Sequence, residues 1–160
     1  MKKFIIAFLG NREVFDENKI LNAILDQLED FLQPWNTTAL PERIVFYCGG
    51  YGRFDGLASQ AIDLLRNKYP DFKAEKYLII PYCNPAYLKR IAFLKKCYDD
   101  FIYPPIETAP PKYVIQYRNR WIIDKSDYII AYMQNPFGNT KKLIAYARAH
   151  RKNVVLLNHS

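Results

Sequence analysis

A glycine-rich turn after a short apolar run is the feature of this chain that most directly suggests chemistry. Ile44–Tyr47 form an apolar run of β type, Gly49, Gly50 and Gly52 follow it, and a helical pattern begins at Asp55. Glycines let the backbone approach a ligand closely, and a helix N-terminus presents N–H groups and the positive end of a dipole to an anion. The turn therefore predicts a site for a phosphate-bearing ligand, although such glycines can also serve only to turn the chain.

Polar residues that follow or flank other apolar runs add to this candidate site. Arg12 comes after the first run and offers a planar guanidinium to a phosphate or to a surface salt bridge. Asn139 and Thr140 can cap a later helix, and the same helix N-terminus can hold a phosphate. For Asp55 the alternatives are an N-cap and a contact with a ribose hydroxyl. The candidate ligand-binding residues beside these runs are Gly10, Asn11, Arg12, Gly49, Gly50, Gly52, Arg53, Asp55, Gly138, Asn139 and Thr140.

Alternating strands and helices must position these residues. Near-continuous apolar strands separated by amphipathic helices indicate a parallel sheet that is covered on both faces. We therefore expect one α/β, Rossmann-like domain over residues 1–160, with a mostly parallel five-stranded sheet and helices on both faces. The expected strands are 4–9, 44–47, 77–80, 128–132 and 154–157, and the expected helices are 16–32, 55–68, 113–125 and 141–150.

Two further expectations concern the loops. The proline-rich segment 84–112, with a short helix near 85–98, breaks the alternation and predicts an irregular, rigid loop over the top of the sheet. The loops at 10–12, 49–55, 81–84 and 133–140 all leave the carboxyl ends of strands. Because ligands of such sheets bind beyond those ends, we expect the four loops to meet in one crevice.

The composition limits the classes of function. The 160 residues include 23 Lys and Arg against 16 Asp and Glu, and the net charge of +7 favours anionic partners. No segment has the length and apolarity of a membrane span or of a signal peptide, which predicts a cytoplasmic protein. Cys48, Cys83 and Cys97 form no zinc pattern with His150 and His159, so we expect reduced thiols, no metal and no cofactor.

Several motifs along the chain resemble those of one superfamily. Gly10-Asn11-Arg12 stands where its members often have Gly-His-Arg or Gly-Ser-Arg, and residues 47–55 resemble its second-strand glycine motif. Arg118-Asn119-Arg120-Trp121 resembles its arginine-bearing helix. The superfamily is SLOG, which contains the Lonely Guy phosphoribohydrolases and the DNA-processing protein A family, and the nearest resemblance is to its small bacterial YpsA-like branch. The resemblance covers nearly the whole chain and implies a nucleotide-like ligand, with Arg118 and Asn119 as further candidate ligand-binding residues.

One departure from the superfamily pattern bears on catalysis. Lonely Guy enzymes have a Gly-Gly-x-Gly-Thr-x-x-Glu loop where this chain has residues 135–142, which contain no glutamate. In those enzymes that glutamate and the helix arginine are tied to cleavage of an N-glycosidic bond. A carboxylate can support positive charge on the sugar or activate water, whereas lysine cannot. Catalysis is therefore left open, and Asp99, Asp100 and Glu107 are either replacement acids or ordinary exposed carboxylates.

Three functions are consistent with these observations. The first is a sensor or regulatory domain that binds a nucleotide or nucleoside derivative, with the phosphate at the Gly49–Gly52 turn beside Arg12 and Arg118. The second is an N-glycosidase acting on nucleoside monophosphates. The third is binding of single-stranded DNA, although the sequence alone shows no basic stripe interleaved with aromatic residues. The expected partner is a nucleotide-like small molecule, a homodimer is left open, and no membrane partner is expected. The tyrosines that could stack on a base are Tyr82, Tyr98 and Tyr103.

Overall fold

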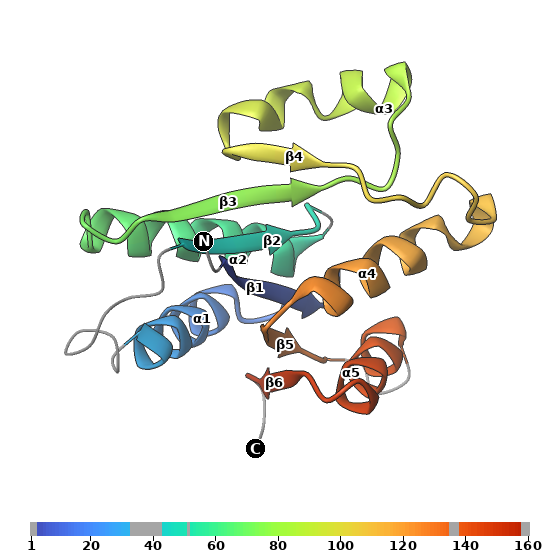
Figure 1. Cartoon of the computed structure of the whole chain (residues 1–160). Helices are drawn as coiled ribbons and strands as arrows, with labels where there is room; N and C mark the ends of the chain where they lie inside the picture. Colours follow the sequence, from blue (N-terminus) through green and yellow to red (C-terminus); the bar gives the residue numbers. More distant parts are fainter. Residues whose placement is uncertain (1–2, 33–42, 51, 135–137, 158–160) are drawn as a thin grey trace.

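Six parallel strands form one sheet in the computed structural model, which describes residues 3–32, 43–50, 52–134 and 138–157 (Figure 1). The strand order is β4-β3-β2-β1-β5-β6, so the chain builds outward from β1 in one direction and then returns to β1's other side with β5. The strands are β1 (Lys3–Gly10), β2 (Arg43–Cys48), β3 (Ala74–Ile79), β4 (Asp100–Ile102), β5 (Tyr128–Tyr132) and β6 (Asn153–Leu156).

Helices cover both faces of this sheet. Alternate residues of β1 point to opposite sides, so that Ile6 packs with the two helices on one face and Ala7 packs with the two on the other. The first pair is α1 (Glu17–Leu32) and α2 (Arg53–Lys68). The second pair is α4 (Val114–Lys125), which follows the short 3₁₀ helix η3 (Pro111–Tyr113), and α5 (Asn139–Ala149).

The helix α1 shows how the sequence specifies these elements. Asp16 precedes the helix, and its carboxylate accepts a hydrogen bond from the Lys19 N–H across 3.3 Å, as an N-cap does. Four aliphatic side chains then recur at helical spacing and are all buried against the sheet. They are Ile20, Ile24, Leu28 and Leu32.

The α/β class and the parallel sheet are confirmed, but the expected count of five strands is wrong. The sixth strand, β4, lies within the segment 84–112 that was expected to be irregular, and it pairs Phe101 with Leu78 and Ile102 with Ile79. It is only three residues long, and Pro104 and Pro105 follow it closely, so it carries no periodic signal. The helix expected near 85–98 is two short pieces, α3 (Pro85–Arg90) and the 3₁₀ helix η2 (Ala92–Lys96).

Some helix starts also differ from expectation. Both α2 and α5 begin two residues earlier than predicted, with Gly52 and Gly138 as their N-caps. None of the helices in the described ranges combines the length and the apolarity that a membrane crossing requires. All three cysteines are free thiols, and burial raises the pKa of Cys48 while Cys83 and Cys97 are exposed. Expected loop residues 34–38 and 135–137, as well as His159, lie outside the described residues.

Candidate functional site

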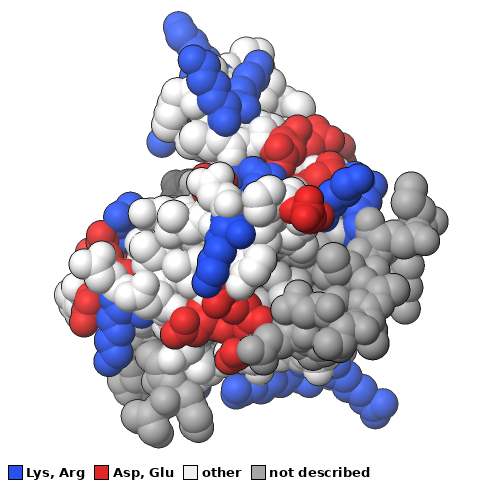
Figure 2. All heavy atoms as spheres, turned by 90° about the vertical axis from the view of Figure 1, so that its left-hand side faces the viewer, with Lys and Arg blue, Asp and Glu red and all other residues white. Residues whose placement is uncertain are grey.

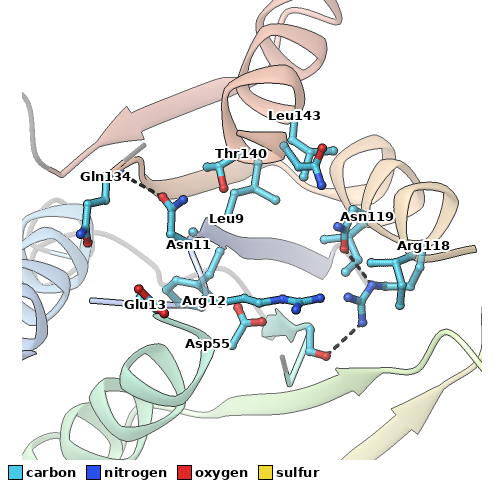
Figure 3. Close-up of a pocket in the computed structure, with 16 residues that line it drawn as sticks. Leu9, Asn11, Arg12, Glu13, Asp55, Arg118, Asn119, Gln134, Thr140 and Leu143 are labelled. Atoms are coloured by element: carbon cyan, nitrogen blue, oxygen red, sulfur yellow. Dashed lines mark hydrogen bonds between the residues drawn. The ribbon is translucent and has the colours of Figure 1, made fainter. Parts of the chain in front are cut away.

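A pocket of about 430 Å³ lies at the carboxyl ends of the central strands (Figure 3). The strands β2 and β5 lie on the two sides of β1 in the sheet. The chain leaves β1 toward α1 on one face and leaves β5 toward α5 on the other face, and the pocket opens where these two connections diverge. Ligands of open parallel sheets bind at such a switch point. Sixteen residues line the pocket: Phe8, Leu9, Gly10, Asn11, Arg12, Glu13, Gly49, Asp55, Ile115, Arg118, Asn119, Ile122, Gln134, Asn139, Thr140 and Leu143.

Asn11 holds two of the converging loops together. Its side-chain oxygen accepts a hydrogen bond from the backbone N–H of Gln134 across 2.8 Å, which joins the loop after β1 to the loop after β5. Three of the four loops expected to meet supply lining residues, whereas the loop at 81–84 supplies none. The crevice predicted from the strand ends is thus present in the structure, but three of the four expected loops border it.

Arg118 connects α4 to the ends of two strands. Its side chain is buried, with 2% of its surface exposed, and Nη1 donates to the carbonyl oxygens of Gly49 (3.0 Å) and Ile79 (2.8 Å). Its Nε donates to the Asn119 side chain across 2.8 Å. Arg118 lines the pocket, and its hydrogen bonds to the two carbonyl oxygens hold α4 against the ends of β2 and β3.

Gly49 permits a close approach of charged groups. A Cβ at this position would lie 3.0 Å from Asp55 Oδ2 and 3.3 Å from Arg118 Nη2, so a larger residue would push against both side chains. Asp55 lies in the first turn of α2, three residues after the N-cap Gly52, so the expectation that Asp55 is the N-cap is wrong. In Figure 3 its carboxylate faces into the pocket.

Gly50 and Gly52 shape the turn and do not line the pocket. Gly50 and Gly52 have φ angles of 67° and 89°, which favour glycine, and neither contributes to the lining. The backbone N–H of Arg53 donates to the Arg12 carbonyl across 2.7 Å. The side chain of Arg53 binds Glu17 instead of the pocket (Nη2 to Oε2, 2.8 Å), and this contact raises the pKa of Arg53 and lowers that of Glu17.

Gly10 serves packing. A Cβ at Gly10 would lie 2.2 Å from a ring atom of Phe54, so the first turn of α2 can sit against the end of β1 only because that residue has no side chain. Gly10 also lines the pocket through its backbone. Its role at the site is therefore to let two elements meet there.

The N-terminus of α5 forms one wall of the pocket. Gly138 is the N-cap and supplies no side-chain cap, so the expectation that Asn139 or Thr140 caps this helix is wrong. Both residues lie in the first turn and line the pocket, and Thr140 is buried. The N–H groups of this turn and the helix dipole favour an anion at this wall.

Arg12 and Glu13 place opposite charges in the loop after β1. Both side chains are exposed and both line the pocket. In the view of Figure 3 the Arg12 side chain extends across the pocket toward Arg118. Glu13 and Gln134 line the pocket but were not among the predicted site residues. The signal for them in the sequence was their position just after an expected strand.

The proposed replacement acids are not at this pocket. Asp99 binds Arg66 (2.7 Å) and the Lys76 N–H (2.7 Å) next to the start of β4, at the amino ends of the strands. Asp100 begins β4 at that same end, and Glu107 is absent from the lining. The expectation that these acids replace the family glutamate at this site is therefore not supported. The tyrosines considered for base stacking, Tyr82, Tyr98 and Tyr103, are also outside the lining.

The charges of the described lining residues balance one another. Two cations, Arg12 and Arg118, face two carboxylates, Glu13 and Asp55, and the other polar side chains are amides and one hydroxyl. Among the described residues, no cluster of His, Cys, Asp or Glu is arranged to hold a metal ion. Neither a scan against protein-family models nor a search of the curated proteins finds a match to this chain.

Proposed function

We propose that this protein binds a nucleotide or nucleoside derivative in the pocket between β1 and β5. The observation that carries the proposal is the position of the pocket at the switch point of a parallel α/β sheet, where such ligands bind. Its volume of about 430 Å³ lies within the range of small-molecule sites. The mixture of amide, hydroxyl and charged groups suits a ligand with several hydrogen-bonding atoms.

The lining suggests positions for a phosphate and for a ribose. We place a phosphate at the N-terminus of α5, near Asn139 and Thr140, because no carboxylate belongs to that turn. The glycine-rich turn is less suitable for a phosphate than the sequence suggested. The carboxylate of Asp55 lies in the first turn of the helix that follows, and the N–H of Arg53 already donates to the Arg12 carbonyl. A carboxylate such as Asp55 accepts hydrogen bonds from ribose hydroxyls, and Arg12 can pair with a phosphate from the loop after β1.

Membership of the SLOG superfamily and a sensing or regulatory role are part of this proposal. The support is the resemblance of the motifs at 10–12 and 118–121, of which residues 10–12, Arg118 and Asn119 line the pocket. The missing glutamate in residues 135–142 favours binding over hydrolysis.

A second candidate, an N-glycosidase, rests on one observation. Glu13 and Asp55 are carboxylates in the lining, so the pocket has acids even though the superfamily glutamate is missing. A hydrolase of this kind needs a carboxylate to activate water or to stabilise charge on the sugar. Release of free base from a bound nucleotide, lost in Asp55→Asn and Glu13→Gln, would favour this candidate.

A thermal-shift screen against nucleosides, nucleotides and ribose phosphates tests the binding proposal. A ligand at about 100 times its Kd adds roughly 2.7 kcal/mol, or about 5–10 °C for a chain of this size. Arg12→Ala should reduce the shift, whereas Arg53→Ala is the matched control because Arg53 lies next to the pocket but pairs with Glu17. The proposal would be refuted if a ligand raised the melting temperatures of Arg12→Ala and Arg53→Ala equally, or if none of these ligands raised that of the wild type.

A further inference from the structure

A short arm connects β3 to β4 and stands apart from the pocket. It comprises α3 and η2, residues 85–96, and we call it the α3–η2 arm. In Figure 1 it lies beyond β4, at the outer edge of the sheet, and none of its residues lines the pocket. It is a separate surface for which the proposed function gives no role.

One side of the arm is anchored to the sheet. Tyr87, Ile91 and Leu94, spaced four and three residues apart, pack in the cluster built on Leu78 and Ile80. The Asn84 side chain caps α3 by accepting a hydrogen bond from the Tyr87 N–H across 2.9 Å. The arm is therefore held in place, and its other residues face solvent.

The solvent side of the arm is cationic. Lys89, Arg90, Lys95 and Lys96 are all exposed, and the sequence from Tyr77 to Tyr98 contains no acidic residue. In the described part of the chain, none of these four cations is in an ion pair. In Figure 2 several Lys and Arg side chains extend from the lobe at the top of the molecule, which is the position of this arm in Figure 1.

An aromatic side chain lies within this cationic segment. Phe93 is 73% exposed and stands between Lys89-Arg90 and Lys95-Lys96 in the sequence. A phenyl ring that is exposed in the same segment as four unpaired cations can contact a ligand that has both negative charge and flat apolar faces. Leu88, 38% exposed, adds a smaller apolar surface beside it.

We propose that the outer side of the α3–η2 arm binds single-stranded nucleic acid. Phosphates would contact the four cations, and one base would stack on Phe93, which is the combination that single-strand binding surfaces use. An anionic membrane is less well matched, because α3 has six residues, η2 has five, and Phe93 is the one large apolar side chain of the arm that is mostly exposed. DNA and RNA share the required chemistry.

The test is fluorescence anisotropy with labelled 20-nucleotide oligothymidine and oligouridine over a series of salt concentrations. If all four cations contact phosphates, log Kd should change with log salt concentration with a slope of about 2.8. Lys89→Ala/Lys95→Ala should reduce the slope to about 1.4, while Lys19→Ala/Lys73→Ala, which removes two exposed lysines elsewhere, should leave it unchanged.

The aromatic contact has its own matched control. Phe93→Ala should weaken binding at least about fivefold, the effect of one lost base stack, and Phe15→Ala should not, although Phe15 is 82% exposed. The inference is overturned if both lysine pairs reduce the slope equally, if the two phenylalanine variants bind alike, or if polyglutamate or anionic vesicles compete as well as the oligonucleotide. A mononucleotide should not displace the oligonucleotide, and displacement would place the binding in the pocket and overturn the assignment to the arm.

Discussion

The guanidinium of Arg118 donates to the carbonyl oxygen of Gly49 across 3.0 Å and thereby joins α4 to the end of β2. The same nitrogen donates to the Ile79 carbonyl at the end of β3. One buried cation thus sets the relative positions of three segments at the edge of the pocket. The sequence motif marks Arg118 as a functional residue, but its contacts in the structure support the site.

Replacing Arg118 should therefore cost stability before it affects binding. Arg118→Met leaves two carbonyl oxygens without their donor, and we expect a loss of about 2–4 kcal/mol in the free energy of unfolding. Arg120→Met on the same helix is the control: Arg120 is exposed and lies 5.4 Å from the centroid of the Tyr146 ring, so loss of this cation–π contact should lower the free energy of unfolding by at most about 1 kcal/mol. Urea denaturation measures both. Equal stability of Arg118→Met and wild type, with loss of ligand binding, would instead make Arg118 a direct ligand contact.

Two glycines should respond to alanine in opposite ways. At Gly10 the new methyl group would lie 2.2 Å from the Phe54 ring, so we expect Gly10→Ala to destabilise the protein by about 1–3 kcal/mol. Gly56 lies inside α2 with its nearest contact at 3.5 Å, the Arg53 Nη1, so Gly56→Ala should stabilise it by about 0.5–1 kcal/mol. Thermal denaturation of the two variants gives both signs. A stabilised Gly10→Ala would show that α2 can move away from β1.

The sequence predicted the sheet and the location of the pocket because both depend on local patterns. Apolar runs such as Tyr128–Tyr132 mark parallel strands, and the residues that directly follow them gather at one edge of the sheet. The strand β4 carries too few residues to show a pattern. The role of Arg118 depends on how α4 packs across two strand ends, which no local pattern records.

The cationic arm was missed for a related reason. Lys89-Arg90 and Lys95-Lys96 belong to two different short helices, separated at Ile91, so no single helical period brings them together in the sequence. In the structure both pairs are exposed on one anchored arm, and Phe93, which stands between them in the sequence, is exposed too. The absence of a visible basic stripe in the sequence therefore did not exclude a basic surface.

Stability should fall in acid partly through Asp99. Burial raises the pKa of the Asp99 carboxyl, but hydrogen bonds from the Lys76 N–H and from Arg66 more than offset this, so its pKa lies below the ordinary value of about 3.9. A carboxyl with a lowered pKa stabilises the folded state above its unfolded pKa, and this contribution is lost as pH falls through the folded value.

We accordingly expect the difference in unfolding free energy between wild type and Asp99→Asn to be present at pH 6 and to shrink below about pH 4. Asp99 is 41% exposed, so solvent screening keeps the difference small, of the order of 1 kcal/mol. Urea titrations at several pH values measure it, with Asp26→Asn on the exposed side of α1 as the control. A difference that stays constant from pH 6 to pH 2.5 would mean that the Asp99 contacts do not depend on its charge.

The charge balance of the pocket should limit the number of phosphates that its ligand carries. Arg12 and Arg118 are matched by Glu13 and Asp55, and Arg118 already donates to two backbone carbonyls. Each phosphate beyond the first would therefore add negative charge near carboxylates without a new cation to receive it. We expect a nucleoside triphosphate to bind no more tightly than the corresponding monophosphate when both are titrated calorimetrically. Asp55→Asn removes one carboxylate from the lining and should improve binding of the triphosphate more than that of the nucleoside. If affinity instead rises about tenfold with each phosphate in wild type, the ligand's phosphates must lie on cations outside this lining.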